Sequence, residues 1–424
     1  MCFPRASLGR YSTSLIAGER SMDRRDFILA ASAIGGAAAA APVSQAASLD
    51  VASPVASRSA MLGLLKALDS LQADYLSPAW RIQSANDIAE GERLLLHLLN
   101  TAINFWLEAD AERPVFTPYT TPTRKLLGDN PDALYYFAPV RPDRSYRIRG
   151  NLAGASFTSF TVEGGSAAGG TASASTAAID DAALAVGPDG SFEIIASPEK
   201  PPAGVWLPLA ASAGQITTRH YFESRNCIVN QPGFQVPLTI EALAPPPLAA
   251  APDDAGIAAR ILAVERFVRG MMQMSIAGGA GKGPRPAWFS TTPNVFTAPG
   301  QWQSESGYGN MHAHYCAAPF VLGPEQALVI EGELPDCRFA NVMLWNRYMQ
   351  TLDYTRRQIS LNRAQMHFLP DGRYRVVVAG RDPGVPGWID TEGRASGLVY
   401  WRFLLARGAV PTPVGRVVSL TELA

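Results

Sequence analysis

Four clusters of polar residues in this sequence have the composition of a binding or catalytic site. The largest follows Trp345 and contains Asn346, Arg347, Asp353, Tyr354, Arg356, Arg357 and Asn362. Arginine can bind a carboxylate, sulfate or phosphate through two parallel hydrogen bonds, and neighbouring aromatic rings can stack on the ligand. We therefore expect Arg347, Tyr354, Arg357 and Asn362 to bind a ligand. The alternative is an Arg–Asp network that braces the loop against a sheet.

A loop rich in proline and glycine forms the second cluster. Residues 381–390 read Arg-Asp-Pro-Gly-Val-Pro-Gly-Trp-Ile-Asp. Two prolines and two glycines favour a rigid loop of defined shape, and binding residues are often found on such loops. Arg381 and Trp388 are candidate ligand-binding residues, and Asp382 and Asp390 are candidate acid–base catalysts.

Two histidines, His312 and His314, form the third cluster. Residues two apart on a strand share a face, so both imidazoles could reach one first-row metal ion. A third ligand would have to come from a distant part of the chain, with the candidates His220, Asp353, Asp382 and Asp390. The alternative is a pair of hydrogen-bonded histidines at a sandwich edge. We predict no cofactor, and a divalent metal at these two histidines remains the alternative.

The fourth cluster surrounds a turn at residues 128–131. It contains Arg124, Lys125, Asp129, Asn130, Asp132 and Tyr135. Gly-Asp-Asn-Pro favours a turn, and the charged residues around it could line a cleft between two parts of the chain. Arg124 and Asp129 are its candidate ligand-binding residues. The sequence contains no nucleophile elbow, zinc-protease motif, P-loop or dinucleotide fingerprint.

The elements that must position these clusters occur twice. The pattern I-x-G-x-L-x4-F at residues 148–157 recurs at residues 330–339, an offset of 182. The same offset aligns Asp189-Gly190 with Asp371-Gly372 and Trp206 with Trp388, and it pairs Ile216, Thr218 and Phe222 with Leu398, Tyr400 and Leu404. Glycine and tryptophan are hard to replace in a packed fold, so their agreement indicates a tandem duplication.

Each copy alternates strand-like segments with turns and follows a helical stretch. Helices are predicted at Ser59–Tyr75, Asp87–Glu108 and Ala255–Gln273. We predict a mainly β fold with a helical N-terminal segment and two tandem, related β-sandwich or jelly-roll-like units. The boundaries are 47–112 for the helical segment, 113–244 for the first β-rich unit, 245–283 for a linker and helix, and 284–424 for the second β-rich unit.

The beginning of the chain has the order of a removable export signal. Arg24 and Arg25 precede an apolar, alanine-rich stretch at Ile28–Ala41, and Ser44-Gln45-Ala46 offers small residues for cleavage. We predict a twin-arginine signal peptide within residues 1–46, starting at Met1 or Met22. The twin-arginine export machinery is then a partner, and the protein is periplasmic or secreted.

Composition excludes some classes of partner. The chain has 36 Lys+Arg against 37 Asp+Glu and a formal net charge of −1, so it lacks the basic excess of a nucleic-acid-binding protein. No stretch after the signal is apolar and long enough for a membrane span. The three later cysteines, Cys227, Cys316 and Cys337, cannot all pair. Unpaired buried thiols are favoured over a Cys316–Cys337 disulfide.

Three segments resemble the bacterial family defined by domain of unknown function 1214. They are Thr121–Tyr136, Leu344–Asn362 and Ala379–Thr391. The resemblance extends over nearly all of the chain after the signal. It implies a β-sandwich or jelly-roll fold near the C-terminus, in the second β-rich unit, and it implies no established activity.

The composition of the clusters favours a binding protein. We expect an exported protein that binds a small anionic or aromatic metabolite in a cleft lined by Arg, Trp, Tyr and Asp. One alternative is a periplasmic lyase or hydrolase, metal-assisted through the histidines or using acid–base aspartates. Another is a structural envelope protein. The binding and enzyme hypotheses are both weakened if Arg347, Arg357, Arg381, Asp382 and Asp390 scatter over the surface instead of lining one cavity.

Overall fold

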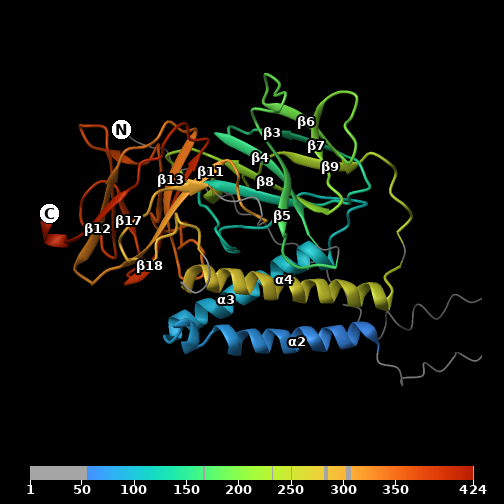
Figure 1. Ribbon diagram of the computed structural model, residues 1–424, viewed down its shortest axis with the longest axis horizontal. Coiled ribbons are helices and arrows are strands. Elements are labelled where there is room, and N and C mark those ends of the chain that lie inside the picture. The colour runs from blue at the N-terminus through green and yellow to red at the C-terminus, as the bar shows by residue number, and fades with distance from the viewer. Residues whose placement is uncertain are drawn as a thin grey trace, which may run out of the picture. The chain divides into compact units, whose positions relative to one another are not determined.

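Four β-sheets form the framework of the computed structural model (Figure 1). The structure describes residues 55–165, 168–231, 233–249, 251–280, 285–301 and 307–423. The predicted export signal lies outside these residues. The sheets form two sandwich-like pairs, as the alternation of strands and turns predicts. The described residues from 55 onward belong to one unit by their internal contacts.

The first sandwich has an inner and an outer sheet. Inner sheet 1 has the order β1-β2-β8-β4-β5, with bounds Thr117–Pro118, Ala133–Pro139, Ala213–Tyr221, Phe157–Gly164 and Ala174–Asp180. Outer sheet 1 has the order β7-β6-β3-β9, with bounds Val205–Pro208, Ser191–Ser197, Tyr146–Asn151 and Leu238–Ala242. Apolar residues of both sheets, including Ile148, Phe160 and Ile216, form the core between them.

The second sandwich repeats this arrangement. Inner sheet 2 has the order β10-β11-β18-β13-β14, with bounds Gly300–Gln301, Ala313–Val321, Ser396–Leu404, Phe339–Trp345 and Ser360–Asn362. Outer sheet 2 has the order β15-β16-β12-β19 with β17 on β16, and the bounds are His367–Phe368, Tyr374–Ala379, Gln326–Gly332, Val414–Ser419 and Trp388–Asp390. Trp401 of β18 faces Tyr374 of β16, with ring centroids 4.8 Å apart, so their side chains fill this second core.

Register and hydrogen bonding confirm the duplication. Gly150 lies opposite Phe192 and Gly332 lies opposite Tyr374, each at an offset of 182. A Cβ atom would lie 2.5 Å from the Phe192 ring at Gly150 and 2.5 Å from the Tyr374 hydroxyl at Gly332, so a larger residue would displace the facing aromatic side chain. The Trp206 indole donates to the carbonyl nine residues earlier at 3.1 Å, and Trp388 does the same at 3.1 Å. The shared glycines and tryptophans therefore hold the same contacts in both units.

The predicted alignment of β8 with β18, its equivalent strand in the second copy, is wrong by one residue. Phe157 lies opposite Tyr221, and its equivalent Phe339 lies opposite Leu404. Tyr221 therefore corresponds to Leu404, an offset of 183, because the second copy has one extra residue after its tryptophan. Successive strand residues point to opposite faces, so a shift of one exchanges the two faces of the strand.

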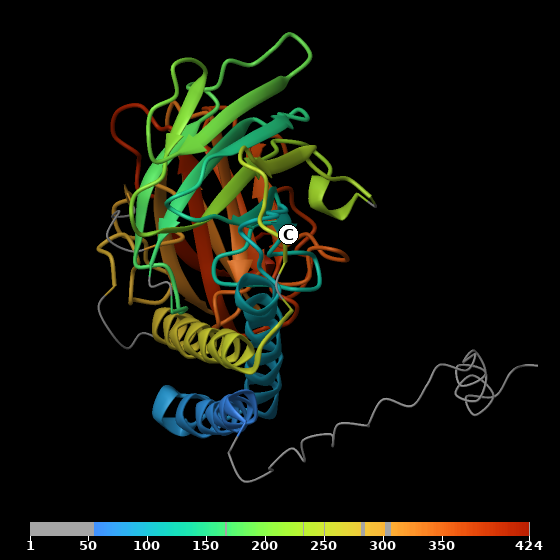
Figure 2. The same cartoon turned by 90° about the vertical axis from the view of Figure 1, so that its right-hand side faces the viewer.

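Helices form a further layer beside the sandwiches (Figure 2). They are α2, α3 and α4, with bounds Ala56–Tyr75, Ala85–Ala102 and Asp254–Ala280, which contain or overlap the three predicted helices. Helix α3 begins at Ser84, whose hydroxyl accepts the Asp87 N–H at 3.0 Å. It continues into a π-helical segment, η2 (Ile103–Leu107). Short 3-10 turns are η1 (Pro78–Trp80), η3 (Ile228–Asn230) and η4 (Leu420–Glu422).

The two inner sheets face each other, and the helices close one side of the space between them. Tyr221 of inner sheet 1 packs against Phe339 of inner sheet 2, with ring centroids 5.2 Å apart. Phe105 of η2 contacts Phe137 of β2 at 3.9 Å and Phe267 of α4 at 5.3 Å between centroids. Within the described residues, no helix has the length and apolar character needed to cross a membrane.

Candidate functional site

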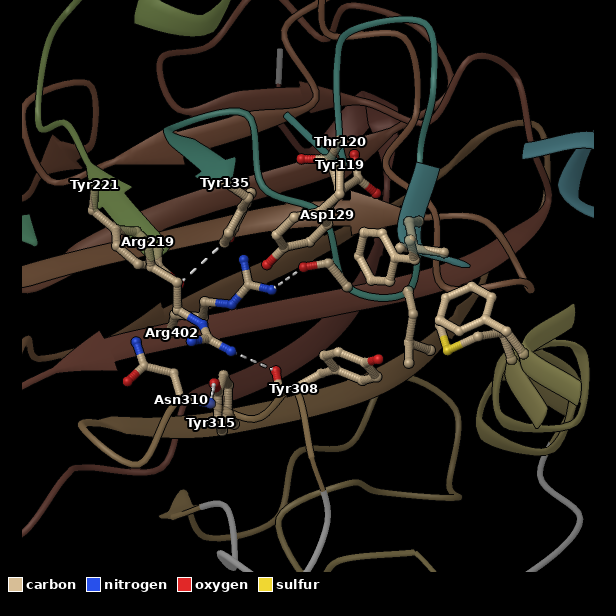
Figure 3. A pocket seen from close by; sticks show the side chains of 16 residues that line it. Tyr119, Thr120, Asp129, Tyr135, Arg219, Tyr221, Tyr308, Asn310, Tyr315 and Arg402 are labelled. Atoms are coloured by element: carbon tan, nitrogen blue, oxygen red, sulfur yellow. Dashed lines mark hydrogen bonds between the residues drawn. The ribbon is translucent and has the colours of Figure 1, made fainter. Parts of the chain in front are cut away.

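A buried cavity of about 60 Å³ lies between the inner sheets, beneath η2 and α4 (Figure 3). That volume suits a few water molecules or one small anionic group. Its polar wall consists of Tyr119, Asp129, Tyr135, Arg219, Tyr221, Tyr308, Asn310, Tyr315 and Arg402. Its apolar wall includes Phe105, Leu126, Phe267 and Met271.

Each inner sheet contributes one arginine and one tyrosine to this cavity from equivalent positions. Arg219 of β8 lies opposite Tyr135 of β2, and Arg402 of β18 lies opposite Tyr315 of β11. Both arginines are buried, with exposed fractions of 3% and 4%. The duplication therefore supplies a matched Arg–Tyr pair on each side of the cavity.

Arg219 is held entirely by the protein. One terminal nitrogen donates to Thr161 Oγ1 at 2.9 Å, and the other donates to the Tyr308 carbonyl at 2.9 Å. The Glu163 carboxylate lies 3.7 Å from this guanidinium and is itself buried. Glu163 also accepts the Thr217 hydroxyl at 2.8 Å. Arg219 and Glu163 thus form a buried ion pair with further hydrogen bonds, the arrangement that offsets the cost of burying both charges.

Arg402 has no such partner. One terminal nitrogen donates to the Gly128 carbonyl, the other lies 3.6 Å from Met343 Sδ, and Nε has no hydrogen-bond acceptor among the described residues. No carboxylate of the described residues lies within 4.0 Å of its guanidinium. A guanidinium has five N–H donors, and leaving a buried charge unpaired is costly. Arg402 therefore presents unused donors and a positive charge without a direct ion pair, although the buried carboxyl groups of Asp129 and Asp132 act on it from a longer distance.

Two substitutions between the copies explain this difference. Glu163 lies opposite Gln215, and the residue at its position in the second copy is Trp345, opposite Leu398. By the same register Thr217 corresponds to Tyr400. The Trp345 and Tyr400 rings stack at 4.0 Å, and the Arg402 guanidinium lies 5.5 Å and 5.2 Å from their centroids. Aromatic faces attract a cation without neutralising it.

The tyrosines around the arginines remain uncharged at neutral pH. Burial raises the pKa of Tyr315 to about 12 and raises the pKa of Tyr119, Tyr135 and Tyr308 as well. The Tyr135 hydroxyl donates to the Tyr221 hydroxyl at 3.4 Å. Neutral phenols can donate hydrogen bonds to an anion, so the wall combines a free cation with neutral donors.

Asp129 is the one predicted ligand-binding residue that lines this cavity, together with Tyr135 of the same predicted cluster. Its carboxylate accepts the Thr351 N–H at 2.9 Å and the Thr351 hydroxyl, and its carbonyl accepts the Trp345 indole N–H at 3.1 Å. Burial raises the pKa of Asp129, and Lys125 nearby opposes that shift. The turn at residues 128–131 thus holds Trp345 in place and directs the Gly128 carbonyl at Arg402. Arg124 lies outside the cavity and donates to Asn100 at 2.6 Å.

The polar side chains of the predicted cluster after Trp345 bind other groups of the protein. Arg347 donates to the carbonyls of Trp80 and Arg81 and to Asp87, and thereby ties the loop to the helices. Arg357 pairs with Asp390 at 2.6 Å, and Asn362 donates to Asp132 at 2.9 Å. Tyr354 lies beneath the Lys125 ammonium, 4.4 Å from its ring centroid. These four candidate ligand-binding residues do not line the cavity.

The polar side chains of the proline- and glycine-rich loop also bind other groups of the protein. Arg381 is exposed and pairs with Glu325, and Asp382 is exposed and accepts the Gly384 N–H at 2.8 Å. Trp388 donates to the Ala379 carbonyl as described above. The loop belongs to outer sheet 2, on the far side of the second sandwich from the cavity.

The two histidines do not converge on a shared carboxylate. His312 Nδ1 lies 3.5 Å from Asp180, and its ring packs against Phe157 at 5.6 Å. His314 lies opposite Phe403 in inner sheet 2. Burial lowers the pKa of both imidazoles. In the part of the chain that the structure describes, no three His, Cys, Asp or Glu residues are grouped to hold a metal ion.

The cysteines follow the favoured interpretation. Cys227, Cys316 and Cys337 are all free, and the latter two are buried. Burial raises the pKa of the Cys316 thiol to about 12 and of the Cys337 thiol to about 11. Cys316 donates to the Thr297 carbonyl at 3.2 Å. These thiols stay protonated and belong to the core.

The two arginines are not evident from the sequence because function-capable residues that occur in only one copy are the better site candidates. An arginine occupies this position in both copies, Arg219 in the first and Arg402 in the second, but the ungapped offset of 182 aligns Arg219 with Trp401. A one-residue gap after the shared tryptophan would have aligned them. The contrast between Glu163 and Trp345 would then have been visible as well.

Comparison with a known family places a domain on the first sandwich. Residues 138–223 match the family described as "Protein of unknown function (DUF1214)". The chain contains a DUF1214 domain. It spans β3 to β8 and includes Glu163 and Arg219, whereas the resembling segments of the sequence implied a location in the second unit. The DUF1214 match therefore covers one wall of the cavity.

Solved structures resemble the chain over most of its length. An uncharacterized protein from Burkholderia cenocepacia aligns with a TM-score of 0.75 and 28% identity, over 86% of this chain and 97% of that one. A protein from Vibrio parahaemolyticus aligns with a TM-score of 0.45 and 12% identity, over 78% of this chain and 98% of that one. Neither description names an activity. No curated protein matches the chain.

Proposed function

We propose that this protein binds a small anion in the cavity between its inner sheets, with Arg402 as the residue that holds the negative charge. One observation carries the proposal: Arg402 is buried without a counter-ion, while its duplicate Arg219 is paired with Glu163. Retaining an unpaired charge costs stability, and an anion that enters the cavity would remove that cost.

The donors of Arg402 suit a small anion. Its Nε and the terminal nitrogen Nη1 are free of oxygen acceptors in the described structure, and they point to different sides of the guanidinium. A carboxylate or phosphate oxygen can accept a charge-assisted hydrogen bond from either donor. Neutral tyrosine hydroxyls in the same wall, such as that of Tyr119, can donate to the remaining lone pairs.

Titration calorimetry with acetate and with inorganic phosphate tests the proposal. We expect the wild-type protein to bind at least one of these anions, and Arg402→Met to lose that binding because methionine keeps an unbranched apolar stem but has no charge and no N–H donor. Arg381→Met is the matched control, since Arg381 is exposed and paired with Glu325. Equal binding by Arg402→Met and wild type, or binding of neither anion by the wild type, would contradict the proposal.

We further propose that the protein performs this role after export. The support is the order of Arg24-Arg25, the alanine-rich stretch and Ser44-Gln45-Ala46. Fractionation of cells that express the full chain should find the mature protein outside the cytoplasm. Replacing both arginines by lysine should retain the precursor inside the cell, and unchanged export of that variant would refute the twin-arginine route.

A further inference from the structure

A groove of about 570 Å³ lies beside the cavity. It runs between η2 and α4 on one side and inner sheet 1 on the other, and it shares Phe105 and Tyr308 with the cavity wall. A volume of this size is typical of small-molecule sites, whereas the cavity alone is too small for more than an anionic head. The two spaces are therefore neighbours separated by two aromatic side chains.

Small apolar residues dominate the groove. They include Ala109, Ala111, Val140, Ala211, Ala213, Ala259, Leu262 and Ala263. Its three arginines have partners in the protein: Arg260 donates to the Leu107 carbonyl at 2.5 Å, Arg266 donates to the Ala168 carbonyl, and Arg141 pairs with Asp143 at 2.6 Å. The one carboxylate of its lining, Glu163, is bound to Thr217 and lies beside Arg219. Such a surface favours a hydrocarbon chain over a second charged group.

The two residues of the shared wall differ in how firmly they are held. Phe105 is buried and packs against Phe137 and Phe267. Tyr308 is half-buried, and its backbone is fixed because its N–H donates to Glu163 at 3.1 Å and its carbonyl accepts from Arg219 at 2.9 Å. Its hydroxyl accepts one hydrogen bond within the described residues, from the Ala172 N–H at 3.3 Å. The Tyr308 ring is thus the part of the wall that can rotate to join the two spaces.

We propose that the ligand is a monocarboxylate with an apolar tail. Its carboxylate lies on Arg402 in the cavity, and its tail passes Tyr308 into the alanine-lined groove. This inference rests on the proposed anion site and adds the class of molecule that the site accepts. Burial of the tail would supply affinity that the small head alone lacks, since each buried methylene stabilises binding.

Calorimetric titrations with acetate, octanoate and 1-octanol test the inference on the full-length mature protein. We expect octanoate to bind at least about tenfold more tightly than acetate, and 1-octanol to bind more weakly than octanoate because it has no charge for Arg402. Ala259→Trp fills the groove from an exposed position of α4 and should leave acetate binding unchanged while reducing the preference for octanoate to about threefold or less.

Two further variants separate the possible failures. Ala255→Trp introduces the same ring at another exposed position of α4 that does not line the groove, and it should keep the octanoate preference. If octanoate is no tighter than acetate, or if Ala259→Trp keeps the preference, the tail site is refuted. If 1-octanol binds as well as octanoate, the carboxylate does not lie on Arg402 and the proposed orientation of the ligand is refuted. The anion site still stands in those cases when Arg402→Met loses acetate binding. Binding of neither acid to the wild type refutes both proposals.

Discussion

The two halves of the inner core use the same arginine–tyrosine pair for different purposes. In the first half Arg219 is paired with Glu163, and every terminal nitrogen has an oxygen acceptor from the protein. In the second half Trp345 occupies the position of Glu163, and Arg402 lacks an anionic partner among the described residues. Duplication followed by the loss of one counter-ion can thus turn a structural ion pair into a binding group.

The largest expected effect comes from the same substitution at both arginines. Arg219→Met leaves Glu163 buried without its cation and should lower the free energy of unfolding by about 3–5 kcal/mol. Arg402→Met removes a buried charge that has no direct ion pair, together with its hydrogen bond to the Gly128 carbonyl, so we expect a clearly smaller loss of about 1 kcal/mol or less in buffer without added carboxylate or phosphate. Urea denaturation of both variants measures the difference.

Equal destabilisation by the two variants would break the comparison, because it would mean that Arg402 also has a stabilising counter-ion. Arg381→Met serves as the control for removing an exposed arginine, where we expect a change within about 1 kcal/mol. Added acetate should stabilise the wild type and Arg381→Met but not Arg402→Met.

A smaller effect concerns pH. His220 is buried in the first half, and burial lowers its pKa to about 3 from the usual 6.5. Phe403 occupies the equivalent position in the second half and does not titrate. The unfolded chain binds a proton at His220 below pH 6.5 and the folded chain does not, so stability falls as the pH falls from 6.5 toward 3. His220→Phe should remove about 2–3 kcal/mol of this loss between pH 6.5 and about pH 4.5.

Denaturation of the wild type and of His220→Phe across this pH range isolates the contribution of His220 to the free energy of unfolding. Burial also raises the pKa of Asp132 to about 6, which acts in the opposite direction: the folded state favours the protonated acid, and stability falls as the pH rises from 3.8 toward 6. Asp132 is present in both proteins, so its contribution cancels in the difference. An unchanged pH slope in His220→Phe would show that His220 is not buried as a neutral group.

The smallest effect tests the matched part of the two halves. Trp206→Phe and Trp388→Phe each remove one indole hydrogen bond of 3.1 Å to a carbonyl nine residues earlier. Both should lower the free energy of unfolding by about 1 kcal/mol, and by the same amount within a few tenths. A cost at Trp388 well above that at Trp206, or a loss of acetate binding in Trp388→Phe, would indicate a role for the Arg381–Asp390 loop beyond the fold.

Much of the architecture could be predicted from the sequence because it depends on local patterns. Helical periodicity located α2, α3 and α4 within a few residues at most ends, and Asp371-Gly372 marked the turn before β16, where Gly372 has a φ of 87°. Of the residues in the four predicted clusters, only Asp129 and Tyr135 line the cavity. Arg347, Arg357 and Asn362 had the composition of a site, but their partners are distant carbonyls and carboxylates of the same chain.

The sequence by itself determined that the chain is built twice, because Gly150 and Gly332 each face an aromatic side chain that a larger residue would displace. Tertiary structure alone decided which arginines share a cavity. One extra residue after Trp388 changes the offset between the copies from 182 to 183, and an alignment error of one residue assigns a side chain to the core instead of the cavity. The net charge of the cavity likewise depends on residues of neighbouring strands. Glu163 lies beside Arg219, and Trp345 lies beside Arg402. The two residues of each pair are more than fifty positions apart in the sequence.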